Sequence, residues 1–272
     1  MSGRITAKRV AHIQSQLGDD DLHVLKHLAL TKLVCGHQVR RLTSSVSVHE
    51  RRALQRRLLH LTELRVLSRL GRRIGGVKAG SDGYVYALDV VGQRIVDPEP
   101  RRQWRPPWTP SVRTLNHALS VSELYVRLVE AERTGSLELL SFTTEPACWR
   151  SFVGPGGARL ILKPDAHLIV GTDETEIHAW IEMDMATESL AWITEKARTY
   201  GRYFATGKEQ TQHGVFPTCL WIAPDQARAN GLIDALSRLP AEDWQLHQVT
   251  TATDTLDDLL GQHQLITGEP QP

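Results

Sequence analysis

The chain has 272 residues, of which 41% are hydrophobic and 23% charged, and its 32 Lys and Arg nearly balance its 31 Asp and Glu. Both fractions are ordinary for a soluble globular protein, and the length suits two domains that each bury a core. No stretch approaches the length of a membrane-spanning helix, so we expect no membrane partner. Three widely spaced cysteines without a CxxC pair argue against a disulfide framework or a cysteine zinc site, and they favour a cytoplasmic protein.

The charge is divided unevenly along the chain. Residues 1–113 carry 21 basic and 9 acidic side chains, a net charge of +12, whereas residues 114–272 carry 11 basic and 22 acidic side chains, a net charge of −11. A basic region of this size is typical of proteins that bind phosphate backbones. The acidic half would repel DNA unless its carboxylates had a counter-cation. We therefore expect a module that binds double-stranded DNA, joined to a module of different chemistry.

A proline-rich segment lies close to the point where the charge changes sign. Residues 97–110 hold five prolines, which exclude a helix or a central strand and predict a semi-rigid linker. Trp104 and Trp108 in this segment could stack on bases, but we favour a role in pinning the linker to a domain surface. The predicted organisation is a first domain over residues 1–96, a linker over 97–113, a second domain over 114–262 and a frayed tail over 263–272.

Three helices are predicted in the first domain. Asp19, Asp20 and Asp21 can cap a helix that runs through Leu30. A short second helix covers residues 37–42. The third begins at Ser47, because the segment from Ser47 to Glu50 matches a capping box. Its apolar stripe is formed by residues 54, 58 and 61, so most of its arginines face outward.

A β-hairpin follows the third helix. Strands over residues 65–69 and 84–88 flank a Gly- and Arg-rich loop over residues 71–80. Three helices and a hairpin with a basic tip form the winged-helix arrangement, in which one helix fits the major groove and the loop reaches phosphates or the minor groove. The candidate DNA-binding residues are Arg40, Arg41, Arg51, Arg52, Arg56, Arg57, Arg72, Arg73 and Lys78. A solvated basic face without a ligand, or a winged helix that binds a protein, are the alternatives.

The second domain alternates helical and strand patterns. The expected elements are a helix over 115–132, strands near 137–143, 159–170 and 176–184, a helix over 189–204, a strand over 216–223, a helix over 225–239 and a strand near 244–249. This order predicts a mixed sheet flanked by helices, in the α+β or α/β class.

Acidic side chains mark the strand over residues 176–184 as a chemical site. Alternation places Glu182 and Asp184 on one face of an otherwise apolar strand, where ionised carboxylates are costly to bury without a cation. Asp165 follows Pro164 on the preceding strand and could approach Glu182 if the two strands are hairpin neighbours. Such oxygen ligands suit Mg²⁺ or Mn²⁺, which could activate a water for attack on a phosphate. Alternatively, the carboxylates face solvent, pair with nearby arginines, or keep a metal without turnover.

At these residues the chain resembles the PD-(D/E)xK, or restriction-endonuclease-like, nuclease superfamily. That pattern places a Pro-Asp pair on one strand and an acidic-x-Lys sequence on the next. Pro164-Asp165 matches the first part and Glu182 matches the acidic position, whereas Asp184 stands where the lysine is expected.

The resemblance implies a restriction-endonuclease-like mixed-sheet domain and a set of site residues. In some members the lysine moves to the following helix, for which Lys196 is the candidate, and the helix before the first strand adds an acid, for which Glu123 is the candidate. Catalytic roles would then fall to Asp165, Glu182, Asp184, Lys196 and Glu123, with Mg²⁺ or Mn²⁺ held by Asp165, Glu182 and Asp184.

The two halves together resemble the replication-relaxation family of plasmids and mobile elements. The residues that carry the resemblance are the segment 84–88, His117, Glu123-Leu-Tyr125, Pro164-Asp165, Glu182, Asp184, Thr187, Lys196, and Tyr200 or Tyr203. The family implies a role in plasmid replication, DNA relaxation or mobilisation. Expected partners are replication or conjugation proteins of the same element, and binding to a palindromic site would need a homodimer. Two functions remain open: a Mg²⁺-dependent endonuclease or nickase, and a non-enzymatic DNA-binding regulator whose nuclease fold serves assembly.

Overall fold

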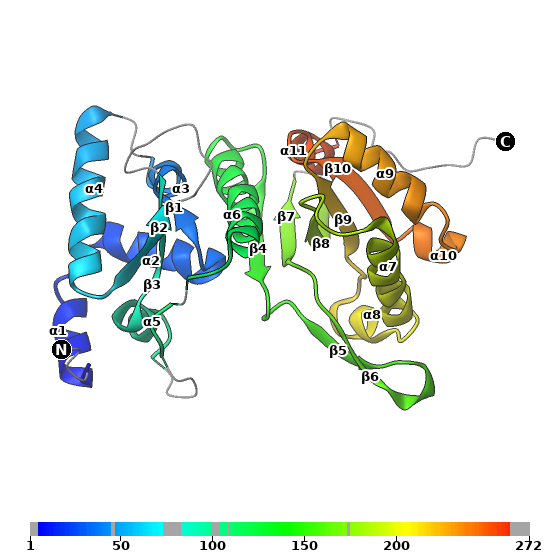
Figure 1. Ribbon diagram of the computed structural model, residues 1–272, viewed down its shortest axis with the longest axis horizontal. Coiled ribbons are helices and arrows are strands. Elements are labelled where there is room, and N and C mark those ends of the chain that lie inside the picture. Colours follow the sequence, from blue (N-terminus) through cyan, green and yellow to red (C-terminus); the bar gives the residue numbers. More distant parts are fainter. Residues whose placement is uncertain are drawn as a thin grey trace. The chain divides into compact units, whose positions relative to one another are not determined.

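The computed structural model describes residues 5–44, 47–72, 83–98, 104–107, 109–172 and 175–261. The chain divides into two compact units, Met1–Val126 and Arg127–Pro272, and each combines helices with strands (Figure 1). The fold is therefore mixed α and β, as predicted. None of the helices in the described ranges is long and apolar enough to cross a membrane.

The first unit contains the three helices and the hairpin expected from the sequence, with short elements before and after them. Its elements are α1 (Ala7–Gln14), α2 (Asp19–Thr31), β1 (Val34–Cys35), α3 (Gly36–Leu42), α4 (Val48–Glu63), β2 (Leu67–Arg72), β3 (Tyr84–Leu88), α5 (Val90–Val96) and the first part of α6 (Val112–Arg133). The strands form an antiparallel sheet in the order β1-β3-β2.

Local signals explain how α4 begins and which face it buries. The Ser47 hydroxyl accepts a hydrogen bond from the backbone N–H of Glu50, and the Glu50 carboxylate accepts one from the backbone N–H of Ser47. Leu54, Leu58 and Leu61 are buried along one stripe. The predicted capping box and inward face are both confirmed, so the arginines between the leucines are left at the sides and the outer face of the helix.

The division between the units lies inside α6 rather than in the proline-rich segment. Leu115 and Leu119 of α6 share a core cluster with Leu70, Val85 and Ala87 of the hairpin. The start of α6 therefore completes the first unit, although its position after the proline-rich segment predicts that it belongs to the second domain. An apolar helical stripe shows that a face is buried, but not which sheet buries it.

Part of the proline-rich segment is held against α5. The indole Nε1 of Trp104 donates to the carbonyl oxygen of Asp97 at 3.3 Å, and the guanidinium of Arg94 lies 4.9 Å from the centre of the Trp104 ring. Gln93 donates to the carbonyl oxygen of Arg105. Trp104 thus pins this segment to a surface of the first unit, as we favoured. Trp108 and the predicted tail over residues 263–272 lie outside the described residues.

The second unit is built on a five-stranded sheet with the order β10-β9-β8-β7-β4. Strand β8 is antiparallel to β7 and parallel to β9, so the sheet is mixed as expected. The elements after α6 are β4 (Glu138–Thr144), β5 (Arg150–Val153), β6 (Arg159–Leu162), β7 (Ala166–Gly171), β8 (Glu176–Met183), α7 (Leu190–Phe204), α8 (Lys208–His213), β9 (Thr218–Ala223), α9 (Gln226–Leu236), α10 (Ala241–Trp244), β10 (His247–Thr251) and α11 (Thr255–Leu259).

The prediction of a single strand over residues 159–170 is wrong, because this segment forms two strands that belong to different sheets. Strand β6 pairs with β5 in a separate two-stranded sheet, and β7 joins the main sheet. The break falls at Pro164, which has no N–H to donate to a strand ladder. After it, the backbone N–H of Asp165 donates to the carbonyl oxygen of Ile181. The chain is thereby brought alongside the carboxyl end of β8.

Helices α7 and α9 pack against the same face of the main sheet. Ile193 and Ala197 of α7 and Leu232 of α9 share a core cluster with Trp221 of β9 and Val249 of β10. An adjoining cluster joins Trp180 of β8 to Tyr200 and Tyr203 of α7. The face of β8 that carries Trp180 and Glu182 therefore lies under α7.

Candidate nucleic-acid interface and carboxylate cluster

The outer face of α4 presents two exposed arginines one helical turn apart. Arg52 and Arg56 lie opposite the buried leucine stripe, and the exposed side chain of Leu59 lies beside them. Among the described residues, no carboxylate forms an ion pair with either guanidinium. This face is consequently a positively charged helical surface.

Arg57 has a different role from its neighbours on α4. Its Nη1 lies 2.7 Å from Oδ2 of Asp20, and its Nε lies 3.0 Å from Oδ1 of Asp21. The hydrogen bond from Arg57 and its charge lower the pKa of the exposed Asp20 carboxyl. Arg57 therefore ties α4 to the first turn of α2, and two carboxylates balance its charge.

Arg41 is also balanced, and its partner is Glu123. The guanidinium of Arg41 binds Oε1 of Glu123, and the side-chain amide of Gln38 donates to Oε2 at 3.0 Å and to the carbonyl oxygen of Leu119. These contacts fasten α3 to α6 within the first unit. They give no support to a catalytic role for Glu123, which stays a prediction.

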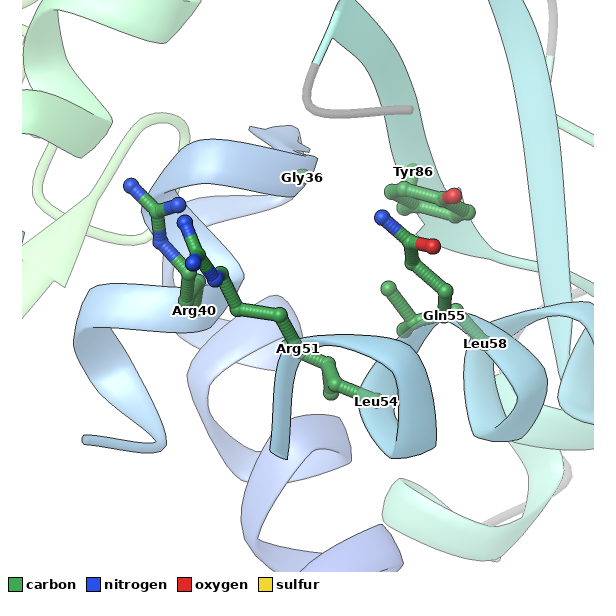
Figure 2. Close-up of a pocket in the computed structure, with 7 residues that line it drawn as sticks. All are labelled: Gly36, Arg40, Arg51, Leu54, Gln55, Leu58 and Tyr86. Carbon is green, nitrogen blue, oxygen red and sulfur yellow. The ribbon is translucent and has the colours of Figure 1, made fainter. Parts of the chain in front are cut away.

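Arg40 and Arg51 line a surface hollow formed by α3, α4 and β3. Figure 2 shows their guanidinium groups at one end of the hollow and the Gln55 amide and Tyr86 ring at the other. The described residues that line it are Gly36, Arg40, Arg51, Leu54, Gln55, Leu58 and Tyr86. Of the other predicted DNA-binding residues, Arg73 and Lys78 lie outside the described residues, and so does the side chain of Arg72 at the end of β2.

In the second unit, Glu182 lies at the centre of a buried polar cluster. Its side chain is on β8 under α7 and the residue is 2% exposed. Nζ of Lys196 binds one carboxylate oxygen, and the hydroxyl of Tyr200, one turn further along α7, donates to the other at 2.5 Å. Burial raises the pKa of Glu182 to about 7, against the opposing effect of Lys196. Burial alone would lower the pKa of Lys196, but the charges of Glu182 and Asp165 raise it, so the lysine is protonated.

Asp165 lies beside this pair, as expected for hairpin neighbours. Strands β7 and β8 are antiparallel, and Oδ2 of Asp165 accepts a hydrogen bond from the backbone N–H of Met183 at 2.7 Å. Its charge also contributes to the raised pKa of Glu182. The structure thus brings together Asp165, Glu182 and Lys196.

Asp184 is turned toward a cation that the sequence pattern does not indicate. Its two carboxylate oxygens bind Arg228 of α9, with distances of 2.5 Å from Nε to Oδ2 and 3.3 Å from Nη2 to Oδ1. The backbone N–H of Ala186 also donates to Oδ1. Pairing with an arginine was one of the alternatives for these acids, but 44 positions separate Arg228 from Asp184 and no local pattern links them.

This arrangement does not fit the divalent metal implied by the nuclease resemblance. Asp184 is neutralised by Arg228, and both oxygens of Glu182 are already bound by Lys196 and Tyr200. Within the described ranges, no group of three or more His, Cys, Asp or Glu side chains could hold a metal ion. Protonated Lys196 supplies the positive charge that a metal would otherwise bring to these carboxylates.

Comparison with known proteins gives the chain a family. The replication-relaxation family matches residues 25–219, which is well over half of the sequence. The chain belongs to the replication-relaxation family. Membership suggests a role in the replication or mobilisation of a plasmid or other mobile element. No curated protein and no solved structure matched the chain. In this replication-relaxation protein, the α4 surface and the Glu182 cluster lie within the matched residues, whereas Arg228 lies beyond them.

Proposed function

We propose that this replication-relaxation protein binds double-stranded DNA through a winged helix in its first unit, with α4 in the major groove. The observation that carries the proposal is the outer face of α4, where exposed Arg52 and Arg56 have no carboxylate partner among the described residues. The element order α2-β1-α3-α4-β2-β3 and the sheet order β1-β3-β2 suit a winged helix. Residues 1–126 also carry 21 basic and 10 acidic side chains, a net charge of +11.

Local ion pairs divide the arginines of the first unit into those with a carboxylate partner and those that are available to DNA. Arg41 and Arg57 are bound to carboxylates of their own unit, so their positive charge is largely balanced before DNA arrives. Arg52 and Arg56 are left to contact bases or phosphates in the groove. The proposal therefore assigns direct DNA contact to a smaller set of residues than the sequence pattern indicates.

Titrations of duplex DNA at several salt concentrations test this proposal. We expect Arg52→Ala and Arg56→Ala each to weaken binding and to reduce the slope of log affinity against log salt by about one. Arg198→Ala is the matched control, because Arg198 is an exposed arginine on α7 of the second unit. If the two α4 variants bind like the native chain at every salt concentration, α4 is not the DNA-binding helix.

Hydrolysis of DNA is a second candidate function, favoured by one observation. Lys196 reaches Glu182 beside Asp165, and this agrees with the relocated lysine that the PD-(D/E)xK resemblance implies. The lysine could stabilise charge on a phosphate, but it would first have to leave Glu182. The ion pairs instead favour the regulator, in which the second unit is an assembly domain.

Nicking of supercoiled plasmid in Mg²⁺ or Mn²⁺ separates these two functions. For the regulator, the native protein leaves the plasmid intact while it still binds DNA, and Asp165→Ala does not change its DNA affinity. Metal-dependent nicking that is lost in both Asp165→Ala and Glu182→Ala would establish a nuclease instead. Arg198→Ala again serves as the control, since it lies on the same helix as Lys196 but on its exposed face.

A further inference from the structure

We propose that the hollow between α3, α4 and β3 binds one phosphodiester group of the DNA backbone, which Arg40 and Arg51 hold together. The inference rests on the proposed DNA-binding function and adds a specific ligand group and site to it. Arg40 comes from the last turn of α3 and Arg51 from the first turn of α4, yet both line the same hollow. Figure 2 shows that the two side chains extend to the same end of it.

The charge of the hollow favours an anion. Among the described residues that line it are two arginines and no acid. Two like charges at one end of a hollow repel each other, and a bound anion would remove that repulsion. Arg40 and Arg51 are also half-buried, so solvent screens their field less than that of a fully exposed arginine.

The shape of the side chains favours a phosphate among anions. A guanidinium is planar and offers parallel N–H groups that match two oxygens of a phosphate, so two guanidinium groups can share its oxygens. Leu54 and Leu58 form an apolar part of the lining and cannot compete for those oxygens. Gln55 adds an amide donor at the opposite end.

The position of the hollow favours a phosphate of the DNA backbone over free phosphate. Arg51 precedes Arg52 on α4, so the hollow borders the outer face that the proposed function places in the major groove. In helix-turn-helix proteins the helix before the recognition helix crosses the backbone beside that groove, which is the place of α3 here. A phosphodiester at the groove edge would therefore reach Arg40 and Arg51 together.

Duplex titration against salt tests whether the two arginines share one phosphate. With the full-length chain, we expect the double variant Arg40→Gln/Arg51→Gln to lose roughly 0.9 from the salt slope, the value for one phosphate. Arg51→Lys keeps the charge but not the paired donors, so we expect it to retain most of the slope while binding several-fold more weakly. If the double variant loses the slope expected for two phosphates, the two arginines do not share one phosphate. If its slope and affinity are unchanged, the hollow does not bind the DNA backbone.

Thermal unfolding with inorganic phosphate separates the two sources of the anion. We expect phosphate to raise the melting temperature of the native chain more than sodium chloride of equal ionic strength does, and the excess to vanish in the Arg40→Gln and Arg51→Gln variants. If these variants lose the extra stabilisation by phosphate but bind DNA as the native chain does, the hollow binds a free anion. That result would overturn its assignment to the DNA backbone. Arg56→Gln is the control: it should keep the phosphate effect and weaken DNA binding. If Arg56→Gln keeps the phosphate effect and also binds DNA as the native chain does, the proposed role of the outer face of α4 is wrong. The phosphate site formed by Arg40 and Arg51 would not be contradicted.

Discussion

His247, at the start of β10, is a buried histidine that the fold keeps neutral. The residue is 4% exposed, and the indole Nε1 of Trp221 donates to its Nδ1 at 3.1 Å. That nitrogen must therefore carry a lone pair rather than a proton. Burial lowers the pKa of His247 to about 4, well below its ordinary value.

This histidine predicts a loss of stability in acid. Between about pH 6.5 and about pH 4 the unfolded chain binds a proton at position 247 that the folded chain excludes, so the free energy of unfolding falls as the pH falls. The full effect is about 3 kcal/mol, at about 1.4 kcal/mol for each pKa unit. We expect His247→Gln, which keeps an acceptor and cannot be protonated, to be less sensitive to pH in urea denaturation. His60→Gln, at an exposed position on α4, should follow the native curve; equal curves for all three chains would contradict the prediction.

The pair formed by Asp184 and Arg228 predicts a large effect of removing one partner. The Asp184 side chain is 1% exposed, so Arg228→Met leaves a buried carboxylate without its cation. Such a loss costs about 3–5 kcal/mol, whereas an exposed pair contributes about 1 kcal/mol or less. Chemical denaturation should show this difference between Arg228→Met and Arg198→Met, because Arg198 pairs with Glu195 at the surface. We expect the double variant Arg228→Met/Asp184→Asn to recover part of the loss. A cost below that of Arg198→Met would mean that the pair does not support the fold.

At the scale of elements, two helical glycines predict opposite effects of the same substitution. In α5, a Cβ added at Gly92 would lie 2.2 Å from the carbonyl oxygen of Val66, which accepts the backbone N–H of Asp89. Gly92→Ala must push α5 from this backbone and should destabilise the fold by about 1–3 kcal/mol. In α9, a Cβ at Gly231 would meet only Leu190 at 3.9 Å, so Gly231→Ala should stabilise the fold by roughly 0.5–1 kcal/mol. If both substitutions shift the denaturation midpoint in the same direction, the close packing of α5 at Gly92 is refuted.

Elements with local chemical signals were predictable, whereas pairings between distant segments were predictable only where a hairpin or a family pattern linked them. Ser47 and Glu50 mark the start of α4 because a capping box involves only four consecutive residues. The contact of Lys196 with Glu182 followed from a family pattern rather than from the spacing of these residues. By contrast, Arg228 carries no local sign that it binds Asp184, and α6 carries no sign that Leu115 packs on the hairpin of the first unit. These contacts arise from the tertiary arrangement alone.

At the scale of the whole molecule, charge and contacts divide the chain at different places. The basic excess ends near residue 113, whereas the compact units meet at Val126 and Arg127 within α6. The helix thus begins in the core of the hairpin unit and continues into the acidic unit. Residues 127–272 carry 11 basic and 21 acidic side chains, a net charge of −10, so long-range attraction should bring DNA to the first unit.

The separate cores predict two unfolding transitions in differential scanning calorimetry of the full chain. Leu70, Val85 and Leu115 stabilise the first unit, whereas Trp180 and Trp221 lie in clusters confined to the second. Gly92→Ala should therefore lower only one transition and Arg228→Met only the other. Duplex DNA binds the folded first unit under our proposal, so it should raise the transition that Gly92→Ala lowers and leave the other unchanged. A single transition that both variants lower would instead mean that the two units unfold together, because α6 runs from the first unit into the second.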